Sequence, residues 1–158
     1  MKKAAVILAI ASFALAAPLA ALAEMDMNHG SMKMEHHGGC GGMMSMGEVA
    51  YDGVVDGVEA TFVVIDIKAK MKEMGMKETH HIMVGFTDDK SGNELSKGEA
   101  KVKVQGPDKS EQVKDLMAME GGFGSDFTMP EKGKYGVMAK FKLNDGKVRS
   151  VKFWYNVK

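Results

Sequence analysis

The residues best suited to chemistry are methionines and histidines, and they are crowded into one stretch near the N-terminus. The chain of 158 residues holds 16 methionines, five histidines and one cysteine. Thioether and thiolate sulfur are soft ligands that select Cu(I), and a thioether needs no deprotonation before it binds. The stretch 24–47 is therefore predicted to bind Cu(I), with Cu(II) as the second candidate. Its candidate ligands are Met25, Met27, His29, Met32, Met34, His36, His37, Cys40, Met43, Met44 and Met46.

A second group of candidate ligands lies in the middle of the chain, around a pair of histidines. Side chains two apart in a strand point the same way, so His81 and Met83 share one face. The other face is apolar, with Ile82, Val84 and Phe86, and it predicts the core. We therefore expect His81 and Met83 to point outward, as two ligands of one ion.

Other residues near this pair have two interpretations each. His80 falls on the core face, where it is either a further ligand or a hydrogen-bonded edge histidine. Met71 and Met74 share one face of a helical turn, which serves packing or ligation. Met117 and Met119 are better explained as core residues. A third ligand beside His81 and Met83 would come from Met71, Met74, Met76 or Met138.

The N-terminus has the three parts of a secretory signal peptide. Two lysines follow Met1, an apolar run covers 4–22, and the run ends in Ala21-Leu22-Ala23. This pattern predicts cleavage after Ala23 and a periplasmic location. A membrane anchor is the alternative, which Pro18 and the small-residue ending disfavour. No second long apolar run follows, so we expect no membrane insertion after cleavage.

Composition divides the chain into a signal peptide (1–23), a tail (24–47) and one domain (48–158). The tail contains no Val, Ile, Leu, Phe, Tyr or Trp, so it should be flexible and disordered without a ligand. From Glu48 onward, β-branched and aromatic residues appear in short runs separated by turn residues. The domain is therefore predicted to be mainly β, an immunoglobulin-like antiparallel β-sandwich.

Short runs predict six to eight strands, and the turns between them are clear. Asn144-Asp145-Gly146 lies between two alternating runs and predicts a β-hairpin. The run 58–67 is apolar on both faces, which is typical of a central strand. Two stretches have helical character, 68–77 and 110–120. Six strands can be placed, over 48–55, 58–67, 79–87, 100–104, 135–143 and 151–157.

Charge and motifs exclude several classes of function. The mature chain would carry 19 basic and 21 acidic residues, so composition favours neither nucleic acid nor an anionic membrane surface as a partner. A single cysteine excludes an internal disulfide. The sequence has no C-x-x-C-H, G-x-S-x-G or Walker motif, and we expect no enzyme. A copper oxidoreductase would require a Cys/His₂ site, and Cys40 is far from His80 and His81 in the chain.

The C-terminal half has a pattern of short strands and turns over 84–88, Ser91-Gly92, 100–104, 133–137 and 151–157. This pattern resembles the YtkA-like and FixH-like group of exported immunoglobulin-like domains. Their association with copper delivery or oxidase assembly implies a similar role here. His81-Ile82-Met83 is similar to the H-x-M ending of PCuAC-type periplasmic copper chaperones, and the tail is similar to metal-binding extensions of copper-resistance proteins.

Together these patterns predict a periplasmic Cu(I)-binding protein that acts in copper chaperoning, buffering or resistance. Its partners would be the metal ion and a periplasmic or inner-membrane copper acceptor protein. The alternative is a non-metal immunoglobulin-like module that docks on an envelope complex. In that case the methionine-rich tail would serve as an antioxidant, because methionine sulfoxide formation is reversible.

Overall fold

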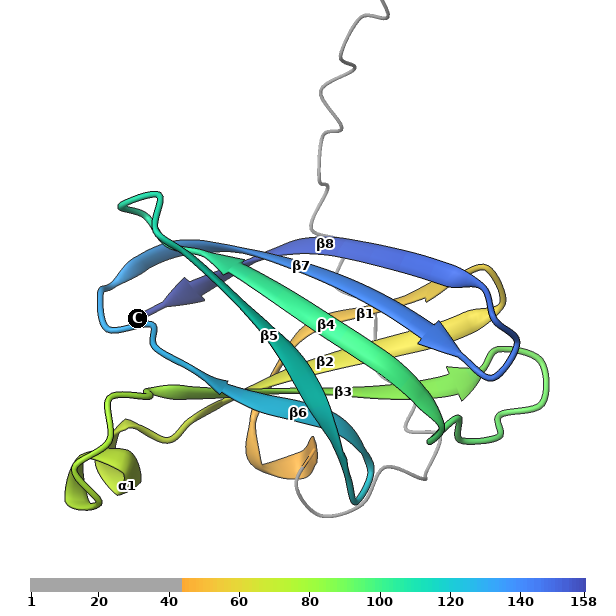
Figure 1. The fold of residues 1–158 in the computed structure, drawn as a ribbon, viewed down its shortest axis with the longest axis horizontal. Helices are drawn as coiled ribbons and strands as arrows, with labels where there is room; N and C mark the ends of the chain where they lie inside the picture. The colour runs from red at the N-terminus through yellow and green to blue at the C-terminus, as the bar shows by residue number, and fades with distance from the viewer. Residues whose placement is uncertain (1–43) are drawn as a thin grey trace, which may run out of the picture. The chain divides into compact units, whose positions relative to one another are not determined.

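Residues 44–158, the part of the chain that the computed structural model describes, are built almost entirely from antiparallel strands (Figure 1). This confirms the expected mainly β class. The strands pair in the order β1-β2-β3-β6-β5-β4-β7-β8. Their bounds are β1 Glu48–Val55, β2 Val58–Asp66, β3 His80–Asp88, β4 Gly98–Gln105, β5 Glu111–Met119, β6 Gly122–Phe127, β7 Gly133–Leu143 and β8 Val148–Val157.

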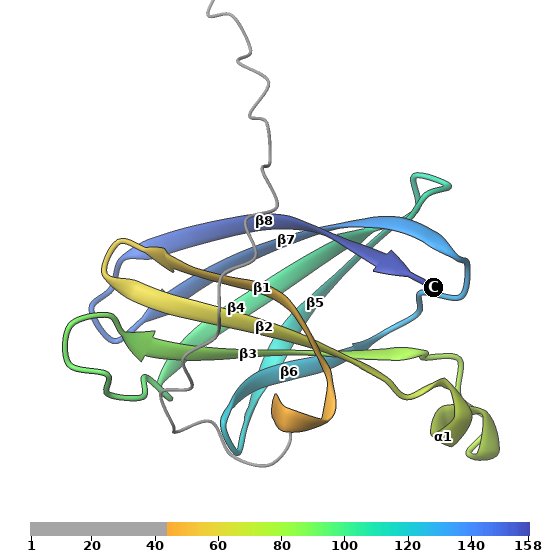
Figure 2. The same ribbon diagram turned by 180° about the vertical axis from the view of Figure 1, so that it is seen from behind.

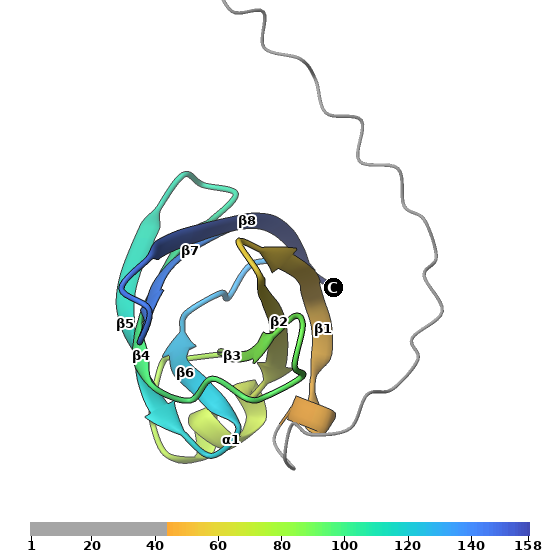
Figure 3. The ribbon, with the colours of Figure 1, turned by 90° about the vertical axis from the view of Figure 1, so that its right-hand side faces the viewer.

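The eight strands fold over into two layers because β5 belongs to both. Its first part pairs with β4 and its last three residues pair with β6. One layer is thus β1-β2-β3-β6 and the other is β4-β7-β8, and the two enclose a common core (Figures 2 and 3). Where the layers meet again, Lys158 Nζ at the end of the chain lies 3.5 Å from Glu48 Oε2 at the start of β1.

Aromatic side chains from both layers fill the space between them. Phe62, Phe123 and Phe127 come from one layer and are fully buried. Phe86 of β3 stacks on Phe141 of β7, with ring centroids 4.3 Å apart, and so joins the layers directly. Burying such a side chain stabilises the fold by about 1.5–3 kcal/mol. The alternation read from the sequence therefore marks the core correctly.

The expected turns and most expected strands are present. Asp56 and Gly57 have φ values of 47° and 76°, which a two-residue hairpin between β1 and β2 requires. Gly146, with φ of 73°, occupies the expected turn between β7 and β8. The six strands placed from the sequence all form, and their ends shift by a few residues at most.

The expected helix over 110–120 is wrong, because this stretch is β5. Its first part forms backbone hydrogen bonds with β4 and its last three residues with β6. This tertiary pairing overrides weak helical propensity. The other expected helix forms as α1 (Lys68–Glu73) and ends before Gly75, whose φ is 71°. Within residues 44–158, no helix is long and apolar enough to span a membrane.

Residues 44–47, which the sequence assigns to the tail, pack on the domain. Met44–Met46 form a 3-10 turn, η1. Met44 packs against Val63 and Met83 and is only 8% exposed. Gly47 lies so close to β2 that a Cβ would be 2.4 Å from Val63 Cγ1. The expectation of a flexible tail is therefore wrong for 44–47. The predicted signal peptide and residues 24–43 lie outside the described residues.

Candidate metal site

The outward face of β3 carries His81 and Met83, as the alternation predicts, but this face is covered. Met83 is fully buried in a small second cluster with Met44 and Val63, and Met119 packs against it. The expectation that Met83 points into solvent is wrong, because residues 44–47 return over this side of the sheet. His81 lies beside this sulfur-rich cluster and is partly buried.

The His81 imidazole is held in one orientation by a carboxylate on the neighbouring strand. His81 of β3 and Asp126 of β6 are register partners, and His81 Nδ1 lies 2.5 Å from Asp126 Oδ1. The carboxylate favours the tautomer in which Nδ1–H donates a hydrogen bond to it. In this tautomer the lone pair is on Nε2. Carboxylate–histidine pairs of this kind orient histidines that bind metals.

The other nitrogen of His81 is buried and lacks a partner. Within residues 44–158, Nε2 makes no hydrogen bond. A Cβ on Gly124 would lie 2.6 Å from this nitrogen and 3.0 Å from the Met119 sulfur. Because Gly124 has no Cβ, an imidazole nitrogen and a thioether can approach the same place. An unsatisfied buried polar atom costs about 1–3 kcal/mol, which a ligand at this position would offset.

A groove of about 1060 Å³ opens beside this nitrogen and is lined by further methionines. α1 and η1 lie on the same side of β3 and β6, as Figures 1 and 2 show, and they form its walls. Met46 and Met117 are 74% and 67% exposed, so their thioethers can move within it. The residues with candidate donor atoms are His81, Met46, Met71, Met117 and Met119.

His80 is not part of this groove and has a structural role. Its ring lies on the core side of β3, only 4% exposed, and Nδ1 is 2.8 Å from Thr79 Oγ1. The Thr79 hydroxyl in turn accepts the backbone N–H of Met129. Burial lowers the pKa of His80, and the nearby Asp66 carboxylate only partly opposes this effect. The hydrogen-bonded interpretation of His80 therefore fits better than ligation.

The other methionines predicted as ligands divide between the groove and the rest of the surface. Met71 and Met46 line the groove, and Met44 lies in the adjoining cluster. Met74 and Met76 are exposed after α1 and are not among the lining residues. The expectation that Met138 could be a third ligand is wrong. Met138 lies on β7 in the other layer, between Lys103 and Lys152 in register, and cannot join His81. The remaining predicted ligands, 25–43, lie outside the described residues.

The sequence does not favour as site residues four that the structure places beside the candidate site, and all lie on β5 or β6. Met117 and Met119 alternate along a strand, and the turn at Gly121 brings the following strand back beside them. The methionine pair followed by a glycine turn was the available signal. The sequence instead favours the core for both methionines, and this expectation is wrong for Met117, which is 67% exposed. The four residues are Met117, Met119, Gly124 and Asp126.

The donor atoms fit a soft, monovalent metal better than a hard cation. Within residues 44–158, no group of three or more His, Cys, Asp or Glu side chains could hold an ion. Zinc and calcium sites are built from such groups. One imidazole nitrogen among thioethers is instead a donor set that suits Cu(I).

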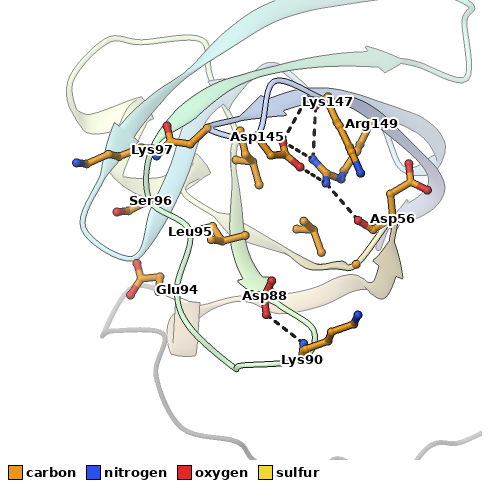
Figure 4. A pocket seen from close by; sticks show the side chains of 14 residues that line it. Asp56, Asp88, Lys90, Glu94, Leu95, Ser96, Lys97, Asp145, Lys147 and Arg149 are labelled. Carbon is orange, nitrogen blue, oxygen red and sulfur yellow. Dashed lines mark hydrogen bonds and ion pairs between the residues drawn. The ribbon is translucent and has the colours of Figure 1, made fainter.

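A second depression, of about 610 Å³, lies at the opposite end of the layers and contains paired charges (Figure 4). Arg149 donates to both carboxylate oxygens of Asp145, at 3.1 and 2.5 Å, and to the Asp56 carbonyl. Hydrogen bonding from Arg149 lowers the pKa of Asp145 to about 2. These contacts join the β7–β8 hairpin to the β1–β2 turn, and we assign them a structural role.

Comparison with known proteins gives a likeness in fold alone. No family model matches the sequence, and no curated protein matches it, so the YtkA-like and FixH-like likeness remains a resemblance. A copper-bound variant of FetP from uropathogenic Escherichia coli superposes with a TM-score of 0.56 at 13% identity, over 70% of this chain and 90% of that one. A copper-bound variant of Campylobacter jejuni P19 gives 0.53 and 13%, over 70% and 96%. A DUF4426 family protein from Pseudomonas aeruginosa gives 0.52 and 11%, over 68% and 94%.

Proposed function

We propose that this protein binds one Cu(I) ion in the groove, with His81 Nε2 and the Met119 sulfur as its first two ligands. One observation carries the proposal: a buried imidazole nitrogen has no partner within residues 44–158, and a thioether lies beside it. Asp126 fixes the ring so that Nε2 presents its lone pair. Met117, Met46 or Met71 would supply the third ligand from the groove walls.

Copper(I) suits this place for electrostatic as well as chemical reasons. Its single charge is cheaper to bury than that of a divalent ion, and thioethers bind it without releasing protons. The neighbouring cluster of Met44, Val63 and Met83 is apolar and excludes water from one side of the ion. Water exclusion would slow oxidation to Cu(II), which prefers nitrogen and oxygen ligands.

Two of the structurally similar proteins, FetP and P19, were solved with copper bound. Their fold therefore accommodates copper in at least these cases, which supports the proposal for this chain. At 13% identity no ligand can be transferred residue by residue. The ligand set proposed here rests on the geometry around His81 alone.

The groove suggests how the ion would be exchanged. One side of the site is a packed cluster and the other is open, with mobile thioethers at Met46 and Met117. Such a site suits transfer to an acceptor better than permanent storage. We therefore favour copper chaperoning, with buffering or resistance as the other outcomes, for an exported chain that begins at Glu24 after cleavage. The predicted ligands within 25–43 would add weaker sites.

Competition for Cu(I) against a chromophoric chelator tests the proposal on the full mature chain. The tightest site should disappear in His81→Gln and weaken strongly in Met119→Leu. Met138→Leu is the matched control, since Met138 is an exposed strand methionine outside the groove. If His81→Gln retains the tightest site, the groove is not the copper site. The alternative of a docking module with an antioxidant tail would then regain support.

A further inference from the structure

The outward face of the β4-β7-β8 layer is covered with lysines. Along β7, buried residues alternate with exposed ones, so Lys134, Lys140 and Lys142 all project from the same side. The neighbouring strands add lysines at matching positions. We name this surface the lysine face, and its basic residues are Lys101, Lys103, Lys134, Lys140, Lys142 and Lys152.

Positive charge exceeds negative charge on the lysine face, where Glu99, the register partner of Lys142, is the only acidic residue that β4, β7 and β8 contribute. Lys101 pairs with Asp115 at 3.1 Å, and Lys103 pairs with Glu111 at 2.7 Å. The other four lysines make no ion pair within residues 44–158. This part of the chain has 18 basic and 18 acidic residues, so its net charge is zero. The positive face therefore results from segregation of charge, which composition alone conceals.

One register pair on the lysine face places like charges opposite each other. Lys101 of β4 and Lys140 of β7 are direct register partners on neighbouring strands. Like charges placed directly opposite each other destabilise a sheet. An anionic surface outside the protein would reduce this repulsion. The arrangement therefore suits binding to such a surface better than it suits the stability of the fold.

A tryptophan lies in the middle of this charge. Trp154 is the only tryptophan in the chain and is 43% exposed. Its ring lies over Gly136, where a Cβ would be 3.0 Å away, with Lys134 Nζ 4.7 Å from the ring centroid. An exposed, amphipathic tryptophan flanked by lysines is typical of surfaces that meet lipid headgroups. Met138, also exposed, adds apolar area beside it.

From these observations we propose that the lysine face docks the protein on an anionic phospholipid bilayer. The lysines are spread over two dimensions, on strands about 4.8 Å apart with side chains about 6.6–7 Å apart along each strand. They do not converge on one point, and neither of the two hollows described above includes any of them. A planar array of phosphates fits such a spread better than a single small anion does. The inference is independent of copper binding.

Vesicle sedimentation of the full mature chain, read together with Trp154 fluorescence, tests this surface. The protein should sediment with vesicles of equal parts phosphatidylglycerol and phosphatidylcholine, but not with phosphatidylcholine alone. Because the chain has one tryptophan, a blue shift of its emission on binding reports on the lysine face itself. Each lysine near an anionic surface contributes about fivefold to binding, and added salt should weaken it.

Charge reversal at two places distinguishes the contribution of the lysine face to vesicle binding from the effect of net charge alone. Lys140→Glu with Lys152→Glu should lower the affinity for anionic vesicles at least tenfold, as about fivefold per lost lysine implies. Lys90→Glu with Lys97→Glu, on the loop between β3 and β4, makes the same charge change elsewhere and should leave most of the affinity. Equal losses in the two variants would overturn the proposal. So would sedimentation without any change in Trp154 emission, equal binding to neutral vesicles, or release by millimolar inorganic phosphate at constant ionic strength.

Discussion

Within residues 44–158, the groove around His81 and the depression around Arg149 each contain one buried nitrogen without a hydrogen bond, yet the two nitrogens differ in chemistry. In the depression, the unpartnered Nε belongs to a cation whose other nitrogens bind Asp145 and the Asp56 carbonyl. In the groove, the unpartnered atom is Nε2 of an imidazole, and the Met119 sulfur approaches the same space above Gly124. Arginine nitrogen can only donate, whereas imidazole nitrogen can bind a metal. A buried nitrogen without a hydrogen bond therefore belongs to a structural ion pair at one end of the layers and to a candidate copper site at the other.

Among the changes proposed here, filling the space at Gly124 should have the largest effect on copper binding in the groove. In Gly124→Ala, the new Cβ would meet His81 Nε2 and the Met119 sulfur, both of which are side-chain atoms and not backbone. The fold should survive, while Cu(I) affinity of the tightest site falls by about a hundredfold or more, since ligands must keep their geometry. Gly136→Ala, a similar close contact on the other layer, is the control in the same titration. Unchanged affinity in Gly124→Ala would show that the ion binds elsewhere.

Removing the cover of the cluster tests whether the groove belongs to the folded domain. A chain that begins at Met44 should unfold at nearly the same denaturant concentration as the mature chain. A chain that begins at Glu48 lacks Met44 and should be less stable by about 2 kcal/mol, the value of one buried methionine. Urea unfolding of the pair measures this difference. Equal stabilities would mean that Met44 contributes nothing to the domain.

Weakening the carboxylate support should reduce copper affinity without removing it. Asp126→Asn keeps the size of the side chain but no longer favours the proton on His81 Nδ1. Loss of such a partner typically lowers metal affinity by about 10–100-fold. Asp115→Asn, whose partner Lys101 is exposed, is the control. If the two variants bind Cu(I) equally well, the His81–Asp126 pair does not orient the ligand.

The smallest effect is expected at the depression and concerns acid stability. The folded pKa of Asp145, about 2, is below its usual value of 3.8, so its contribution to stability is complete above pH 3.8. That contribution is lost as pH falls from 3.8 through about 2. Asp145→Asn should therefore be less stable than the parent at neutral pH, and the gap should close in acid. Thermal unfolding at several pH values checks this, with copper affinity unchanged at neutral pH.

How much of the fold could be predicted depended on whether a signal was local. Alternation along 135–143 reports directly on which side of a strand faces the core, and β7 follows it. The stretch 110–120 has no such clear period, and its strand form depends on pairing with β4 and β6. That pairing is a long-range property, so the sequence reading failed there.

The residues of the proposed site could be predicted only in part, for the same reason. His81 and its outward direction follow from the period of one strand. Asp126, Gly124 and Met119 join it only through the order of β3, β6 and β5, which no local pattern specifies. The burial of Met83 was missed because the return of residues 44–47 over the sheet could not be foreseen from a segment rich in glycine and methionine.

Nitrogen-15 NMR of the histidine rings tests the central claim most directly. The full mature chain, labelled with nitrogen-15 in histidine, receives one equivalent of Cu(I) under reducing, oxygen-free conditions. We expect the Nε2 resonance of His81 to move while Nδ1 keeps its proton to Asp126, with the His80 ring unchanged. If His81 is unaffected and only the rings of His29, His36 and His37 respond, the copper site is in the tail and the account of the groove is wrong.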